Sequence, residues 1–401
     1  MWALPDIGST SSFRLAPEFK LVAACAVWPP STKRCEKIRS HSLDVDWREV
    51  VRLARRHRVA GLVHSALACA GLVAPGESSR ELADQAGETA RQSLRFAAEA
   101  LRLQTLFERS GIPVVFVKGA ALAQLAYGSL AVRHAKDIDL LVPPEHVAAA
   151  LGVMDAAGYK RILPSADLSD HLFELYLDRY KDCSYVHGDG RTHVDLHWKL
   201  DHALDFGSFN PFDSPKFVPI THSGALATLH EQDNFAYLCQ HGARHCWFRL
   251  KWLADIGNLL ERHDEAGVMR LYEAAEARGV GRHAAQALLL CHRLFESPVP
   301  ADLKSRLASG RRNRLLEFVA LRLMVGGGST EPNDRPFGTT VTNLCGLLLC
   351  DSVPGLIHEL RFHLTSWHDV ETLPLPRSVQ WLYPLLRLPL WLWRKAAAGK
   401  H

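Results

Sequence analysis

Two aspartates, Asp137 and Asp139, lie one residue apart in the apolar segment KDIDLLVP (residues 136–143). In a strand, residues i and i+2 point to the same face, so these carboxylates project side by side while Ile138 and Leu140 enter the core. Two carboxylates that close repel each other, and in a dry site one of them takes up a proton. A divalent cation removes this conflict, and Mg²⁺ is normally held by one or two protein carboxylates together with substrate phosphates. The pair therefore predicts a metal site that serves a phosphate-bearing substrate.

A third carboxylate, Asp195, lies in a second apolar segment, HVDLHW (residues 193–198). On a neighbouring strand it completes a site for two metal ions, which can activate an attacking oxygen and stabilise a leaving phosphate. His193 and His197 share the strand face of Asp195, and imidazole nitrogen also suits zinc. We expect these histidines to flank the site and to contact phosphate or acceptor. A D-x-D pair alone also occurs as a solvated pair at a loop edge, so the prediction depends on the surrounding strands.

A strand–glycine–helix turn, FVKGAALAQ, precedes the aspartate pair. Gly119 permits the tight bend, and the amides at the start of the following helix point at an anion. Lys118 supplies a point charge for a phosphate, although a lysine at a strand end is also a common surface residue. Arg133 either clamps a triphosphate with two hydrogen bonds or pairs with Asp137, and the sequence leaves both alternatives open.

A second pair of histidines, His241 and His245, is spaced to share one face of a predicted helix. Such a pair can bind zinc, but Gly242 stands where an H-E-x-x-H motif has glutamate. We expect this face, with Arg244 and Lys251, either to pack beside the active-site cleft and contact substrate or to be wholly structural.

The elements that must position these residues form an alternating pattern of strands and helices. The first two strands are short apolar runs that end at glycine or proline. The third has alternating character, and the segment DCSYVHGDG precedes it as the other arm of a hairpin. Residues 111–200 therefore predict a small α/β domain with a mixed sheet. The expected strands are residues 112–119, 136–143 and 191–200, and the expected helices are residues 120–128 and 144–159.

The sequence on both sides of this core shows apolar residues at helical spacing. Asp46 is a predicted N-cap, a helical run ends at Gly111, and helices are expected from about Thr221 to Met324. The segment VGGGSTEPNDRPFG is the best linker candidate. The predicted fold class is α+β: a minimal mixed-sheet core flanked by N-terminal and C-terminal helical regions. The expected divisions are residues 1–110 (helical), 111–205 (α/β core), 206–325 (helical cover) and 326–401 (linker and helical tail).

Composition bounds the class of protein. The chain has 401 residues, a length that favours two or three domains. Hydrophobic residues make up 47% and charged residues 22%, a balance typical of globular proteins. The net charge of +4 is compatible with a phosphate-bearing ligand but too weak to indicate nucleic acid by itself. The cysteines number 9 and form no C-x-x-C pair, which favours a reduced, cytoplasmic setting. We expect no signal peptide and no transmembrane segment.

Two further segments leave alternatives open. The basic run RLARRHR (residues 52–58) is expected to be a solvated helix face, with contact to RNA or a phosphate-rich acceptor as the alternative. The tail WLYPLLRLPLWLWRKAAAGKH combines aromatic and leucine residues with terminal basic residues, as in a helix on a membrane surface. Because Pro384 and Pro389 are expected to break that helix, packing onto the body or a partner is favoured over membrane contact.

The segments VKGAALAQLAYG, RHAKDIDLLV and HVDLHWKL together resemble the uncharacterised nucleotidyltransferase-like family within the DNA polymerase beta type superfamily. That superfamily is marked by a glycine-containing turn, a [DE]-h-[DE] strand and a later carboxylate strand. The resemblance covers about residues 15–265. The wider superfamily has Gly-Ser or Gly-Gly at the turn, whereas here Ala120 and Ala121 follow Gly119, so no serine hydroxyl is available to hold a phosphate.

The resemblance implies metal-dependent transfer of a nucleoside monophosphate from a nucleoside triphosphate such as ATP to an acceptor, with pyrophosphate leaving. The implied cofactor is Mg²⁺, with Mn²⁺ as the alternative, and the acceptor is a small molecule, peptide, saccharide or tRNA. Three alternatives remain: a nucleotide-binding protein without turnover, a toxin-like enzyme that modifies tRNA or protein, and a tailoring enzyme in peptide or polysaccharide biosynthesis. The implied catalytic and metal-binding residues are Asp137, Asp139 and Asp195, and the nucleotide-binding residues are Lys118, Gly119, Arg133, Lys136 and His197.

Overall fold

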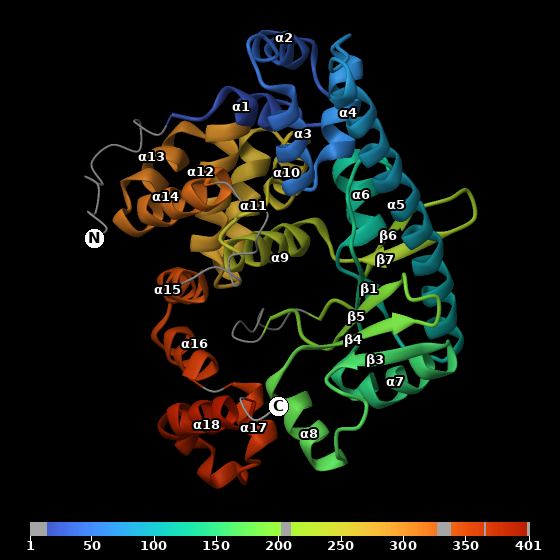
Figure 1. The fold of residues 1–401 in the computed structure, drawn as a ribbon, viewed down its shortest axis with the longest axis vertical. Helices are drawn as coiled ribbons and strands as arrows, with labels where there is room; N and C mark the ends of the chain where they lie inside the picture. Colours follow the sequence, from blue (N-terminus) through green and yellow to red (C-terminus); the bar gives the residue numbers. More distant parts are fainter. Residues whose placement is uncertain (1–13, 202–209, 327–337, 365, 399–401) are drawn as a thin grey trace.

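The computed structural model describes residues 14–201, 210–326, 338–364 and 366–398 (Figure 1). The chain begins with a group of helices whose ends follow the local sequence. Asp46 is an N-cap as predicted, because its carboxylate accepts a hydrogen bond from the amide of Arg48 at 2.9 Å. Gly111 has a φ of 68° and stops the longest helix. The N-terminal helices are α1 (Pro17–Ala24), α2 (Thr32–His41), α3 (Trp47–Arg56), α4 (Ala60–Cys69) and α5 (Glu77–Arg109).

A five-stranded mixed sheet follows, in the order β1-β2-β5-β4-β3. The pair β2–β5 is parallel and the other neighbours are antiparallel, so the predicted mixed sheet and the predicted hairpin of β4 and β5 are both confirmed. The first strand has two residues only, shorter than the apolar run that predicts it. The strands are β1 (Val115–Phe116), β2 (Ile138–Leu141), β3 (Tyr159–Leu163), β4 (Asp182–His187) and β5 (His193–His197).

Helices between the strands cover the sheet, and the long helix α5 runs beside it (Figure 1). Phe96, Leu103 and Phe107 of α5 share one buried core with Leu140 of β2 and Met154. All four residues of β2 are buried, and Leu140 meets the apolar face of α5 at this interface. The connecting helices are α6 (Gly119–Tyr127), the 3₁₀ turn η2 (Pro144–His146), α7 (Val147–Ala156) and α8 (Asp170–Arg179).

A second, two-stranded sheet corrects the prediction that helix begins near Thr221. Strands β6 (Lys216–Pro219) and β7 (Ala225–Thr228) form an antiparallel hairpin, and the helix begins only at Glu231. The alanines of β7 favour helix locally. The side chain of Gln104 holds them extended, because it donates to the carbonyl of Ala225 at 3.0 Å and accepts from the amide of Ala227 at 2.8 Å.

Helices after this hairpin pack with the N-terminal helices into one core, and Figure 1 shows α1 and α3 beside α10 and α12. Phe19 of α1 and Ile38 of α2 are buried in the same cluster as Phe235, Trp247 and Phe295. Segments far apart in the chain thus form a single helical body. Its later helices are α9 (Glu231–Arg244), α10 (Leu250–Leu260), α11 (Glu265–Ala277), α12 (Gly281–Phe295), α13 (Ala301–Ser309) and α14 (Arg311–Val325).

The last helices extend away from this body (Figure 1). The predicted break of the helix at Pro384 and Pro389 is wrong, because α18 is continuous. Pro384 lies in the first turn, where its missing amide costs no helical hydrogen bond. The helix also continues through Pro389. Most of the predicted linker, residues 327–337, lies outside the described residues. The elements are α15 (Gly338–Leu349), α16 (Val353–Leu364), α17 (Trp367–Thr372), η4 (Arg377–Leu382) and α18 (Tyr383–Ala398).

The sequence also predicts reduced cysteines and no transmembrane segment. Every cysteine is a free thiol. Across the described ranges, no helix has the length and apolar character that crossing a bilayer requires.

Candidate active site

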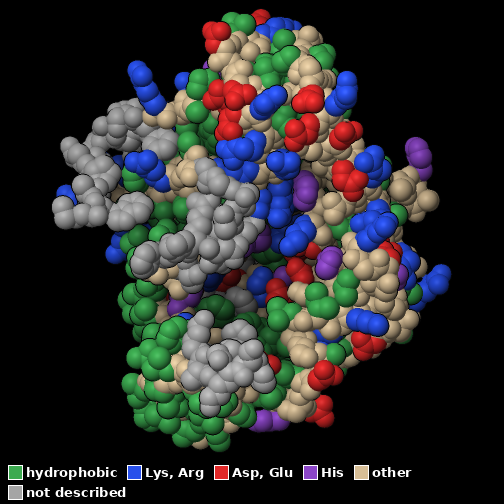
Figure 2. Space-filling view, in the orientation of Figure 1, with side chains coloured by type: hydrophobic (Ala, Val, Ile, Leu, Met, Phe, Trp, Pro, Cys, Tyr) green, Lys and Arg blue, Asp and Glu red, His purple; other side chains and the backbone are tan. Residues whose placement is uncertain are grey.

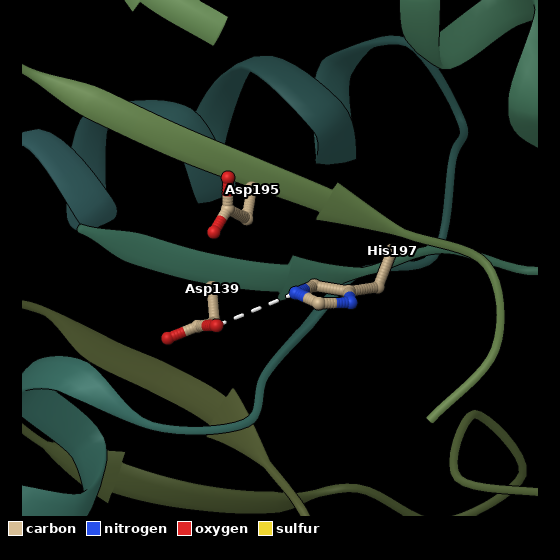
Figure 3. Close-up of side chains that lie close together, drawn as sticks. All are labelled: Asp139, Asp195 and His197. Carbon is tan, nitrogen blue, oxygen red and sulfur yellow. Dashed lines mark hydrogen bonds and ion pairs between the residues drawn. The ribbon is translucent and has the colours of Figure 1, made fainter. Parts of the chain in front are cut away.

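The parallel pairing of β2 and β5 brings two of the predicted aspartates together. Leu141 lies opposite His197 in the register, and Asp139 lies opposite Asp195. Figure 3 shows the side chains of Asp139, Asp195 and His197 close together. Asp139, Asp195 and His197 each offer one ligand atom, and these atoms lie within 4.8 Å of one another. This spacing and the buried position of Asp139 and His197 suit a bound cation.

A lysine and a histidine surround the carboxylate of Asp139. Lys118 donates from Nζ to Oδ1 at 2.7 Å, and Nε2 of His197 lies 3.3 Å from the same oxygen. The other ring nitrogen of His197, Nδ1, lies 3.4 Å from a carboxylate oxygen of Asp182, which holds the ring in place. Burial alone raises the pKa of Asp139, but the charge of Lys118 and the hydrogen bond to His197 outweigh it, so the pKa is well below its usual value.

Asp195 has the opposite electrostatic environment. Burial and the neighbouring charge of Asp139 raise its pKa, while Ser184 donates a hydrogen bond to Oδ1 at 2.7 Å. One carboxylate of the pair is thus firmly ionised, and the other accepts a proton more readily.

The predicted glycine turn joins β1 to α6 beside these carboxylates. Gly119 has a φ of 62°, a conformation that favours glycine, and open space surrounds the position of its missing Cβ. The unpaired amides of the first turn of α6 therefore begin at the pocket, where they suit an anion. Burial disfavours the charged form of Lys118, but Asp139 outweighs that effect and raises its pKa, so Lys118 is an ammonium.

A pocket of about 410 Å³ opens in front of the carboxylates, within the range of small-molecule sites. Lys and Arg side chains outnumber aspartates in its lining, and Figure 2 shows basic and histidine side chains gathered in the middle of this face. An excess of positive charge around two carboxylates suits a polyanion that arrives with a cation. The lining residues are Arg58, Lys118, Gly119, Arg133, Ala135, Lys136, Asp137, Asp139, Lys181, Asp182, Asp195, His197, His241, His245, Arg249, Lys251 and Trp252.

Asp137 and Lys136 line this pocket at its edge. Asp137 immediately precedes β2 and is half-buried, and Lys136 is exposed. Asp137 is not part of the compact ligand group formed by Asp139, Asp195 and His197. His193 lies at the start of β5, outside both that group and the pocket lining.

Arg133 forms a buried ion pair with Asp255 of α10, not with Asp137. Its Nε lies 2.8 Å from Oδ1 and its Nη2 lies 2.9 Å from Oδ2, and both side chains are at most 5% exposed. The hydroxyl of Tyr127 also donates to Oδ1 of Asp255 at 2.8 Å. Arg133 therefore lines the pocket while it links the sheet domain to α10.

His241 in the last turn of α9 and His245 directly after it line the pocket. The ring centroids of His241 and His245 are 4.8 Å apart, and His245 stacks on Trp252 at 4.8 Å. Burial and the charge of Lys118 lower both pKa values, that of His245 to about 3, so both rings are neutral. Arg244 instead pairs with Asp201 and Glu359.

Several lining residues carried no recognisable signal in the sequence. Lys181, Arg249 and Trp252 lie in no motif, and folding alone brings them to the pocket. Arg58 ends the basic run that was expected to be solvated. That expectation is wrong for Arg56 and His57, which are buried.

The surroundings of Lys251 predict that the affinity of the pocket for an anion depends on pH. Burial, together with the charges of Arg133 and Arg58, lowers its pKa to about 7. The ammonium that attracts an anion is present below pH 7 and is lost as the pH rises above it. Between pH 6 and pH 9, the affinity of the wild-type protein for inorganic triphosphate is expected to fall. This fall should be about tenfold larger than the change in affinity of Lys251→Met over the same pH range. Calorimetric titration of both proteins measures the difference; identical pH profiles would contradict the prediction.

A family model described as uncharacterised nucleotidyltransferase matches residues 44–296, a range that contains every residue of the pocket lining. No curated protein and no solved structure matches the chain.

Proposed function

The chain belongs to the family of uncharacterised nucleotidyltransferases, as the resemblance of its motifs predicted, and from this premise we propose its reaction. The protein transfers a nucleoside monophosphate from a nucleoside triphosphate to an acceptor hydroxyl or phosphate. The observation that carries the proposal is the group of Asp139, Asp195 and His197 at the wall of a pocket rich in Lys and Arg.

The donor atoms of this group fit a divalent cation. Two carboxylates offer the hard oxygen ligands that Mg²⁺ and Mn²⁺ prefer, and a buried imidazole adds a nitrogen ligand. When bound, such an ion neutralises phosphate charge and activates the attacking oxygen. Asp137 is the proposed further ligand, because it lies at the edge of the same pocket.

The chain's own residues supply binding and proton transfer. The phosphates bind to Lys118, to the first amides of α6 and to the outer cations of the pocket, including Lys136 and Lys181. The acceptor oxygen forms a bond to the α-phosphorus, and the bond from that phosphorus to the bridging oxygen of pyrophosphate breaks. Asp195 takes the acceptor proton, a role supported by its position beside Asp139.

Pyrophosphate release tests this function. We expect the full-length protein with Mg²⁺ to release pyrophosphate from at least one of the four nucleoside triphosphates when a pool of small molecules, peptides, saccharides and tRNA is present. Titration of each triphosphate in parallel measures binding. Binding without release in every mixture would replace the proposal with that of a nucleotide-binding protein that has no turnover.

A further inference from the structure

The C-terminal helices expose a stripe of large apolar side chains. On α16 the exposed residues recur at helical spacing, so they share one face. Figure 2 shows apolar side chains concentrated at the lower left, where Figure 1 places α15, α16 and α18. The exposed residues of α16 are Val353, Leu356, Ile357, Leu360 and Leu364.

Exposed tryptophans and leucines continue this surface over η4 and α18. Trp381 is 67% exposed and Trp393 is 62% exposed, values that are unusual for the largest apolar side chain. The remaining exposed apolar residues of α18 are Leu385, Leu388, Trp391 and Leu392.

The other side of the same segment is fixed to the body of the protein. Tyr383 is buried, donates its hydroxyl to the carbonyl of Leu373 at 2.9 Å and packs in one cluster with Leu175 of α8. Glu359 of α16 is buried and pairs with Arg244 of α9. The expected packing of the tail onto the body is thus made by these residues, while the exposed stripe faces outward.

The charged residues that follow Glu371 in the sequence are all basic. In the sequence no Asp or Glu follows Glu371, whereas Arg377, Arg387, Arg394 and Lys395 do. Arg387 is exposed among the leucines of α18. Leucine and tryptophan beside basic side chains are the composition of helices that lie on membrane surfaces, and the basic groups favour anionic lipid.

We propose that the surface formed by α16, η4 and α18 binds the face of a bilayer that contains anionic phospholipid. The helices lie in the headgroup region, with leucines reaching the acyl boundary and tryptophans at the interface. The surface follows the range that the family model matches, so it is independent of the proposed chemistry.

Vesicle sedimentation of the full-length protein tests the proposal. The protein is expected to sediment with vesicles of equal parts phosphatidylcholine and phosphatidylglycerol, and less with phosphatidylcholine alone, with a blue shift of tryptophan emission. Binding weakens as salt rises, because part of it is electrostatic. The double variant Trp381→Ser/Trp391→Ser is expected to lose about tenfold in vesicle affinity.

Phe217→Ser is the matched control, because Phe217 is an exposed aromatic residue in the distant β6 strand and its loss is expected to leave binding unchanged. Since both tryptophans are exposed, circular dichroism should show an unchanged fold in the double variant. Failure of the wild-type protein to sediment with either vesicle would overturn the proposal. So would a wild-type dimer in light scattering that becomes a monomer in the double variant, since the surface would then be an interface between two copies.

Discussion

Asp139→Asn is expected to lower the rate of pyrophosphate release by about a thousandfold. Asp139 contributes to the only compact group of metal-ligand side chains among the described residues, and it also orients Lys118 and His197. Asparagine keeps the volume but removes the negative charge, so the site loses a hard ligand and the buried ammonium of Lys118 loses its counter-ion. Release assays on wild-type and variant protein at saturating Mg²⁺ measure the loss.

Two companion variants separate chemistry from folding. Asp195→Asn is expected to lose activity without loss of stability, because burial and Asp139 already raise the pKa of Asp195 and thus disfavour its charge. Asp155→Asn changes an exposed carboxylate on α7 and should leave activity unchanged. Full activity in Asp139→Asn would exclude this group as the catalytic centre.

The second large effect concerns stability. Asp255→Ala is expected to lower the free energy of unfolding by about 3–5 kcal/mol, because it leaves the buried guanidinium of Arg133 without its counter-ion. It also removes the acceptor for the hydroxyl of Tyr127. Urea unfolding followed by circular dichroism measures the change, and a loss below about 1 kcal/mol would contradict a buried, ordered ion pair.

The double variant Arg133→Met/Asp255→Leu separates the two roles of Arg133. Replacing both charges with apolar groups of similar size is expected to recover most of the lost stability. Arg133 also lines the pocket, and a contact with the triphosphate predicts that the double variant binds inorganic triphosphate more weakly than wild type even though it folds. Wild-type affinity in the double variant would assign Arg133 a purely structural role.

The strands that carry the aspartates were predictable, because the apolar run of β2 ends at proline and β5 shows alternating character after the arm of a hairpin. The hairpin β6–β7 was not, since its alanines favour helix and are held extended by pairing with β6 and by the distant side chain of Gln104. Local propensity is overridden there by a tertiary contact that no window of sequence contains.

Part of the candidate site was likewise predictable from local sequence, and the rest was not. Spacing within one strand predicted that Asp137 and Asp139 act together, yet the pairing of β2 with β5 is what places Asp195 and His197 beside Asp139. The partner of Arg133 is Asp255, far along the chain in a helix whose own pattern indicates only amphipathic packing. Ion pairs between distant elements depend on the fold and are therefore hidden from motif analysis.

The contact between Lys118 and Asp139 affects the behaviour of the protein when no metal ion is bound. The lysine acts as a built-in counter-ion, so the fold is complete without any metal, and chelation should leave the melting temperature unchanged. An incoming divalent ion must compete with a tethered ammonium that is always present at the same oxygen. We expect a nucleotide to shift that competition, because its phosphates offer the lysine another anion, so that metal and nucleotide are captured as one complex and not in turn.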